Sequence, residues 1–217
     1  MRVLAEIGAL LYKEFLVEWK QRYAINGLLL YVAGTVFIVS LIFRETMNAQ
    51  VWLTTFWLLN MFLAVNAVAK SFMGESEGQM LYVYQLASAT AIISAKIIYN
   101  VLLMTTLTLA SLALYVGFLG APTEHIGLFT IVAIIGAIGL AVALTLVSAL
   151  TAQAGNKNTL MTLLSLPVVL PQLIFILRLS EKTTLGILPD KDLLYALALT
   201  GVNVLLSLLL FPYLWRQ

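Results

Sequence analysis

Cysteine is absent from the chain, histidine occurs once and charged residues are scarce. Without cysteine the chain can form no disulfide bond and no thiolate metal site, and its single histidine, His125, has no second imidazole with which to share a metal ion. Lys, Arg, Asp and Glu together make up 10% of the residues, and the net charge is only +2. Because this charge is small, the sequence predicts no nucleic-acid partner.

A nucleotide site and a catalytic constellation are missing as well. The glycine-containing segments GESEG and GNKNT lack the G-x-x-x-x-G-K-[ST] order whose backbone amides and lysine hold phosphates. The sequence also offers no paired carboxylates, metal cluster or nucleophile with its base for a membrane-embedded hydrolase or transferase. We therefore predict a protein that is not an enzyme, for which any energy from ATP comes from another chain.

Apolar residues, by contrast, make up 62% of the 217 residues, and the mean hydropathy is +1.00. A helix needs roughly 20 residues to cross the hydrocarbon core of a bilayer, and six apolar stretches are long enough. Little of the chain is left for a soluble domain, so we predict an all-α integral membrane protein. The six predicted spans cover residues 23–43, 51–69, 97–117, 126–149, 160–177 and 193–213.

Residues 1–22 precede the first span and have the pattern of an amphipathic helix. We predict that this helix lies in the membrane interface, with Trp19 and Tyr23 at headgroup depth, and that residues 23–217 form the transmembrane domain. A soluble helix packed on a protein partner is the alternative. The apolar face would consist of Leu4, Ile7, Leu11, Phe15 and Trp19, and the charged face of Arg2, Glu6, Lys13 and Lys20.

The distribution of basic residues predicts the orientation of the spans. Eight Lys and Arg residues fall on the side of the two termini and four on the other side, so both termini are predicted to be cytoplasmic. The eight are Arg2, Lys13, Lys20, Arg22, Lys70, Lys96, Lys157 and Arg216, and the four are Arg44, Arg178, Lys182 and Lys191.

The second loop, residues 70–96, is predicted to be cytoplasmic and contains the segment SFMGESEGQMLYVYQLA. Ser76 and Gln79 form a capping-box pattern, and apolar residues then recur on one face, which predicts a short helix over residues 77–87. Ser88 or Thr90 is expected to cap the next helix, and Lys96 is expected to snorkel to the membrane surface. The predicted apolar face consists of Met80, Leu81, Tyr84 and Ala87. The fifth loop, residues 178–192, is the other loop with room for structure.

Two spans carry patterns that predict how they pack. In the fourth span small residues recur every four positions, which permits close approach of a neighbouring helix. In the fifth span, SLPVVLPQLIF, Pro167 and Pro171 remove backbone donors, so this helix is predicted to be kinked or broken. A plain structural kink and a functional hinge or cavity wall that includes Gln172 both remain open. The small residues are Ala133, Ala137 and Ala141, with Gly139 and Ala143.

None of the six predicted spans contains Asp, Glu, Lys, Arg or His. An ion-coupled carrier usually keeps such a residue at membrane depth, so this class is not favoured. The amide side chains in or next to the spans are expected to make interhelical hydrogen bonds. They are Asn60, Asn66, Asn100, Gln172 and Asn203.

These features together resemble the membrane half of an ABC exporter of the ABC-2 type, in which the helix after span two sits in a groove of the ATPase. The segments SFMGESEGQMLYVYQLASATAIISAKII and LLSLPVVLPQLIF are similar to the CcmB family of the cytochrome c maturation system. The resemblance covers almost the whole chain. The residues that it places at the ATPase are Phe72, Glu75, Glu77, Met80, Leu81 and Tyr84.

The resemblance implies a permease-like subunit of the bacterial inner membrane that binds no cofactor itself. Its expected partners are the ATPase subunit CcmA, the haem-handling proteins CcmC and CcmD, the haem chaperone CcmE, membrane lipid and a second membrane subunit in a dimer. ATP hydrolysis by CcmA would drive haem export or release of the haem-loaded chaperone. An ABC-2 permease that exports a lipid-like or other hydrophobic substrate and a scaffold that anchors partners are the alternatives, and a haem contact of His125 is a minor hypothesis.

Overall fold

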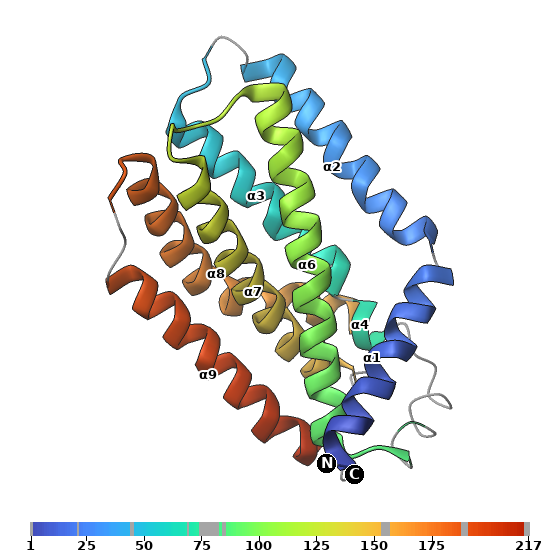
Figure 1. Cartoon of the computed structure of the whole chain (residues 1–217). Helices are drawn as coiled ribbons and strands as arrows, with labels where there is room; N and C mark the ends of the chain where they lie inside the picture. The colour runs from blue at the N-terminus through green and yellow to red at the C-terminus, as the bar shows by residue number, and fades with distance from the viewer. Residues whose placement is uncertain are drawn as a thin grey trace.

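Long apolar stretches dictate the architecture, because a buried or lipid-facing backbone must satisfy its hydrogen bonds within the helix. The computed structural model describes residues 2–20, 22–43, 46–68, 70–73, 83, 86–152, 157–187 and 191–214, and every element in these ranges is an α-helix (Figure 1). The helices are α1 (Arg2–Lys20), α2 (Arg22–Phe43), α3 (Ala49–Val68), α4 (Lys70–Met73), α6 (Ala89–Leu119), α7 (Ile126–Thr151), α8 (Lys157–Thr184) and α9 (Lys191–Leu214).

Six of these helices, α2, α3 and α6 to α9, are long and apolar enough to cross a membrane, which confirms the predicted six-span architecture. Two boundaries differ from the prediction. The third span, predicted from residue 97, is part of a helix that begins at Ala89, where the predicted Ser88 cap places its start, and α8 continues to Thr184 rather than ending near residue 177. The predicted fifth loop is therefore shorter, because its first residues continue α8.

The early start of α6 follows from its cap. Ser88 is the N-cap residue, and its Oγ accepts a hydrogen bond from the backbone N–H of Ala91, which confirms one of the two predicted caps. The helix has 31 residues, and at 1.5 Å per residue it is about 46 Å long. Since hydrocarbon is about 30 Å thick, α6 is long enough to extend well beyond the membrane.

The predicted small-residue face of the fourth span is confirmed in α7, the most buried of the six spanning helices. A Cβ atom on Gly136 would lie 2.3 Å from Cη2 of Trp57 on α3. A Cβ atom on Gly139 would lie 1.9 Å from Nε2 of Gln172 on α8. The neighbouring helices can approach α7 this closely only because these positions lack side chains.

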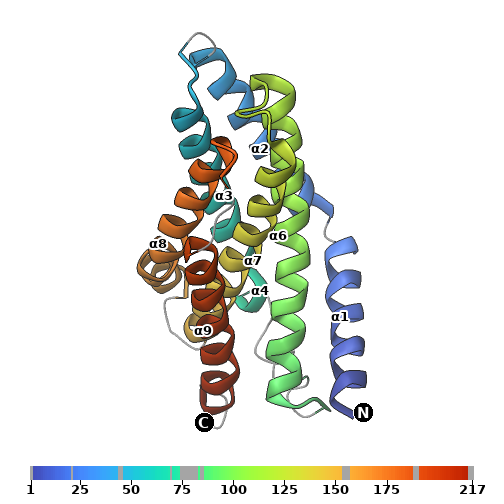
Figure 2. The same ribbon diagram turned by 60° about the vertical axis from the view of Figure 1, so that its left-hand side comes forward.

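The two ends of the bundle differ in what they contain. The N-terminal end of α1 and the C-terminal end of α9 lie at one end, where α1 passes the N-terminal part of α6 (Figures 1 and 2). In Figure 1, α2, α3, α7 and α9 run diagonally, and α1 lies across their lower right ends. The turns from α2 to α3, from α6 to α7 and from α8 to α9 lie at the opposite end. α4 and the N-terminal end of α6, which flank much of the predicted second loop, therefore lie at the same end of the bundle as α1 and the C-terminal end of α9.

The helix of the fifth span is continuous through Pro167 and Pro171, so the prediction of a broken helix is wrong. Both prolines are exposed on the bundle surface. Each still lacks the backbone N–H that would bond to the carbonyl one turn earlier, and α8 changes direction along its course in Figures 1 and 2. The kink part of the prediction agrees with this shape.

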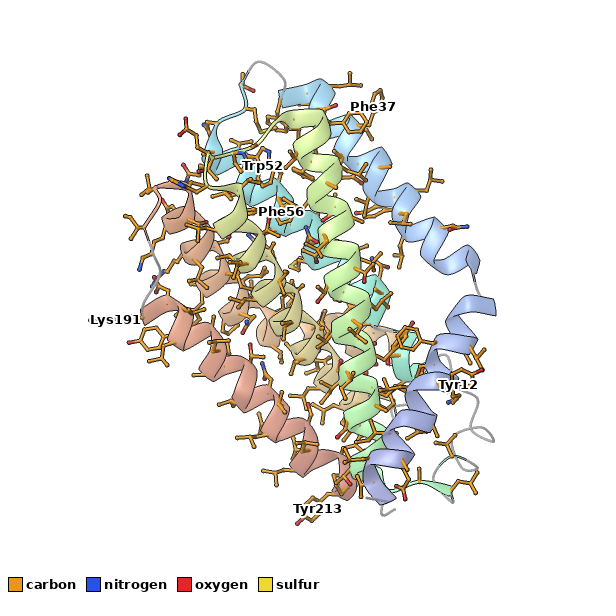
Figure 3. All side chains as sticks on the ribbon, viewed as in Figure 1. Tyr12, Phe37, Trp52, Phe56, Lys191 and Tyr213 are labelled. Atoms are coloured by element: carbon orange, nitrogen blue, oxygen red, sulfur yellow. The ribbon has the colours of Figure 1, made fainter. Side chains whose placement is uncertain are left out.

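A cluster of aromatic rings packs α3, α6 and α7 together near the end opposite the termini. Figure 3 shows Trp52 and Phe56 inside the bundle, whereas Phe37 and Tyr12 lie on its surface. Neighbouring rings in the cluster lie 5.1–5.5 Å apart, mostly edge to face. The cluster consists of Trp52, Phe56, Trp57, Tyr115 and Phe129.

Candidate functional site

The predicted ATPase-contact residues belong to the segment that follows α3. Of them only Phe72 lies among the described residues, on α4. Glu75, Glu77, Met80, Leu81 and Tyr84 lie outside the described residues, as does most of the predicted helix over residues 77–87. The structure therefore describes how this segment is attached to the bundle, and that attachment is the candidate site.

Phe72 anchors α4 in the bundle. Its side chain is fully buried, and its ring centroid lies 5.5 Å from that of Phe211 on α9. The ammonium of Lys96 on α6 lies 5.3 Å from the centroid of the same ring, within the range of a cation–π contact. Phe72, the first of the predicted ATPase-contact residues, is thus buried between α6 and α9.

Lys96 joins three helices at this point. Its side chain is 4% exposed, and its Nζ lies 3.0 Å from the Glu14 carboxylate on α1. The same Nζ donates a hydrogen bond to the backbone carbonyl of Ser71 on α4. The prediction that Lys96 snorkels to the surface is wrong, because the paired carboxylate, the carbonyl and the Phe72 ring compensate the charge inside the protein.

Asn100, one turn after Lys96, extends the junction into the bundle. Its Nδ2 donates to Ser71 Oγ at 3.1 Å and to Thr145 Oγ1 on α7 at 2.9 Å. Thr145 in turn donates to the carbonyl of Ala141 in its own helix. A displacement of α4 would therefore disturb hydrogen bonds that connect it to α6 and, through Asn100, to α7.

α1 is tied to α6 through its carboxylates. Glu6 Oε2 accepts hydrogen bonds from Ser88, at 3.1 Å from the backbone N and 2.9 Å from Oγ, while Glu14 pairs with Lys96. The rings of Phe15 and Tyr99 meet edge to face at 5.5 Å. These contacts place part of the predicted charged face of α1 against α6.

The predicted amphipathic helix is present as α1. Of its predicted apolar face, Leu4 and Phe15 are exposed, at 74% and 50%, and Ile7 and Leu11 are half-buried. The side chains that lie toward α6 include Glu6 and Glu14. The placement of this exposed apolar face in the membrane interface stays a prediction.

We call the contacts among Glu14, Ser71, Phe72, Lys96 and Asn100 the α1–α4–α6 junction. Sequence reasoning identified only Phe72 as a site residue here. It assigned Lys96 to the surface because lysine next to a span usually snorkels, and it did not assign a role to Glu14. The acids on the helix that precedes the first span gave no signal for Lys96, because the basic residue nearest to Glu14 in the sequence is Lys13, with which it also pairs at 3.5 Å.

The second candidate site is around the proline pair of α8. Gln172 is fully buried, and its Nε2 donates to Thr200 Oγ1 on α9 at 3.2 Å. Pro167 and Pro171 are exposed. The structure places the three predicted residues within two turns of one helix, with only Gln172 facing inward, and the roles of hinge and cavity wall stay predictions.

Most of the buried amides act as predicted. Asn60 accepts from Ser111 Oγ on α6 at 3.1 Å, and Asn100 and Gln172 also bond across helices. The prediction is wrong for Asn66, which donates to the carbonyl of Phe62 in its own helix. Asn203 is buried, and its Nδ2 has no hydrogen-bond partner among the described residues.

His125 lies at the other end of the bundle, where it is the exposed N-cap residue of α7 and makes no side-chain capping bond. Its ring packs near Gly186, where a Cβ atom would lie 2.7 Å from Nε2. Within the part of the chain that the structure describes, no three His, Cys, Asp or Glu residues gather as metal ligands.

The fold and the junction define an all-α, multi-pass membrane protein whose termini and first long connection meet at one end of a six-span bundle. The sequence matches the family model described as "CcmB protein" over residues 6–214, and the chain belongs to the CcmB family. No curated protein and no solved structure matches the chain. Family membership makes it a membrane subunit of an ABC transporter that exports haem for cytochrome c maturation, in a complex with CcmA and other Ccm components.

Proposed function

We propose that the α1–α4–α6 junction transmits the closure of a partner ATPase, CcmA, to the membrane helices. The residues that would contact the ATPase are Glu75, Glu77, Met80, Leu81 and Tyr84, on the segment that follows α4, and Phe72, which is fully buried, would anchor this segment in the bundle. The observation that carries the proposal is the attachment of this segment: Phe72 and the Ser71 carbonyl are both held by Lys96, which also pairs with Glu14. A displacement of the segment must therefore move α1, α4 and α6 together.

This arrangement supports a mechanical role for the protein. The junction combines an ion pair, hydrogen bonds and ring contacts that connect helices. Its polar groups bind to one another across these helices. We propose that ATP hydrolysis by CcmA drives haem export or release of the haem-loaded chaperone CcmE, with CcmC and CcmD in the same complex. In this proposal the side of the membrane that carries both termini is cytoplasmic. The protein acts as a dimer, because ATPases of this class close as pairs.

The docking role can be tested by a charge at the centre of the proposed contact face. We expect Leu81→Asp to abolish co-purification of the protein with CcmA, because the aspartate would lose hydration on docking. Leu185→Asp is the matched control, since Leu185 is 69% exposed at the opposite end of the bundle, and it should leave co-purification unchanged. Full retention of CcmA by the Leu81 variant would contradict the docking role.

The fate of haem provides a second test. Because His125 is exposed and caps α7 without a side-chain bond, we expect His125→Ala to assemble with its partners and to support normal formation of covalently haem-loaded cytochrome c. Haem staining of cytochrome c in cells that carry the variant measures this. Loss of maturation in a normally assembled complex would instead identify His125 as a haem contact.

A further inference from the structure

The side-chain environment of α8 changes at Gln172. Most side chains from Thr159 to Pro171 are exposed, whereas most from Gln172 to Thr184 are buried or half-buried. The second half is also tied to its neighbours: Ser180 Oγ accepts from Trp57 Nε1 at 2.8 Å, and Lys182 pairs with Asp192 on α9. The first half of α8 is therefore the more exposed and less restrained half, although Met161 and Val169 are buried in the main core.

The proline pair lies at the end of the less restrained half. Pro167 and Pro171 both lack the N–H that would bond to the carbonyl four residues earlier, so two consecutive turns of α8 are weakened. Gln172 is the first buried residue after them. Any swing of the first half about the prolines would be centred next to its amide.

Gln172 has a hydrogen-bond partner for only one end of its amide. Its Nε2 donates to Thr200 Oγ1, and its Oε1 has no hydrogen-bond partner among the described residues. Asn203, three residues further along α9, is 5% exposed, and its Nδ2 likewise has none in that part of the chain. Three residues advance a helix by about 4.5 Å along its axis. α9 therefore carries an acceptor, Thr200 Oγ1, and a donor, Asn203 Nδ2, at two positions along its length.

α7 leaves room for this amide and limits where it can go. A Cβ atom on Gly139 would lie 1.9 Å from Gln172 Nε2 and 2.7 Å from its Cδ. The amide therefore lies directly against the backbone of α7 and can move along α9 more easily than away from it. Gln172 Oε1 is a buried acceptor and Asn203 Nδ2 a buried donor, each without a partner among the described residues, so a second position in which the two meet would form a favourable hydrogen bond.

We propose that Gln172 is a two-position latch between α8 and α9, which bonds to Thr200 in one state and accepts from Asn203 Nδ2 in the other. The first half of α8 swings about Pro167 and Pro171 when the latch changes position. The proposal relies on the proposed function only for the source of the motion, which is the closure of the ATPase at the α1–α4–α6 junction. The two states themselves are a property of this chain.

Because the chain contains no cysteine, two introduced cysteines can carry unique nitroxide labels. We choose Leu163→Cys on α8 and Leu209→Cys on α9, both exposed, at 63% and 62%. Double electron–electron resonance spectroscopy of the protein in lipid bilayers then measures the distance between the two labels. A control pair at Glu181 and Leu194, in the restrained region, should give one distance in every variant.

The two latch variants should shift the label distances in opposite directions. Thr200→Val removes the present partner and should raise the share of the second distance by roughly fivefold, the ratio that one ordinary hydrogen bond produces. Asn203→Leu removes the other partner and should confine the labels to the first distance. A general folding defect cannot produce opposite shifts, and Asn203→Ala replaces the leucine variant if that does not fold. One unchanged distance in both variants would overturn the latch.

Measurement with CcmA separates this proposal from the proposed function. With ATP trapped in the complex, the unmodified latch should move to the second distance, and Asn203→Leu should abolish this response while ATPase binding persists. Binding and hydrolysis without any change in distance would reject the latch and leave docking intact. Absence of CcmA binding would reject the docking role, and the opposite shifts in the isolated protein would still decide the latch.

Discussion

Lys96→Met is expected to destabilise the protein by about 3 kcal/mol, because it removes a buried cation that contacts the Glu14 carboxylate, the Ser71 carbonyl and the Phe72 ring. Among the described residues, Glu14 would keep only the Lys13 ammonium, which lies 3.5 Å from its Oε1 and belongs to a side chain that is 36% exposed. We take the lower end of the usual range because the Glu14 side chain is 13% exposed. Titration of the folded fraction with a denaturing detergent measures the loss.

Two controls assign this loss to the junction. The double variant Glu14→Gln, Lys96→Met removes both charges and should recover much of the stability. Lys182→Met removes the cation of the Lys182–Asp192 pair at the opposite end, where the lysine is 35% exposed, and should cost less than Lys96→Met, because Asp192 lies in the first turn of α9, where the helix dipole stabilises a carboxylate. Equal losses of stability in the two single lysine variants would show that the α1–α4–α6 junction contributes no more to stability than the Lys182–Asp192 pair.

The junction variant also tests the transmission of force. Because Lys96 holds α1 and α4 at once, Lys96→Met should retain part of its CcmA binding and lose ATP-dependent cytochrome c maturation. The double variant should recover stability but not maturation, since it lacks the contact to the Ser71 carbonyl. Normal maturation in the double variant would contradict the role of Lys96 in coupling.

Gly136→Ala is expected to have the second large effect. Its new Cβ atom would lie 2.3 Å from Cη2 and 2.8 Å from Cζ3 of Trp57, a buried ring whose Nε1 is fixed by Ser180. Overpacking of this kind costs roughly 1–3 kcal/mol, and we expect the upper part of that range because the ring cannot turn away without losing its hydrogen bond. Detergent titration or thermal unfolding followed by circular dichroism measures the difference.

Gly127→Ala on the same helix is the matched control for this change. No atom lies within 4 Å of the Cβ position at Gly127, so this variant should be as stable as the parent or slightly more stable, as alanine favours helix over glycine. If the two variants were equally stable, the contact between α7 and the Trp57 ring would be looser than the structure indicates.

The prediction succeeded where the signal is local. Hydrophobic length alone determines the six spans, and the Ser88 cap depends on a side chain and an amide three residues apart. The small residues of α7 predicted close packing correctly, because the size of a residue can be read directly from the sequence. The proline pair predicted a weakened helix in the same way, but not that α8 would stay continuous through both prolines.

The sequence by itself determined the membrane class, the spans and the family resemblance, because each depends on length, composition or short motifs. The tertiary structure decided which groups meet. Glu14 and Lys96 are far apart along the chain, as are Gln172 and Thr200, and no local period sets the rotation of one helix against another. The residues next to Lys96 in the sequence are compatible with either a solvated or a buried side chain. Burial is favourable only because α1 and α4 approach α6 and provide partners for the charge.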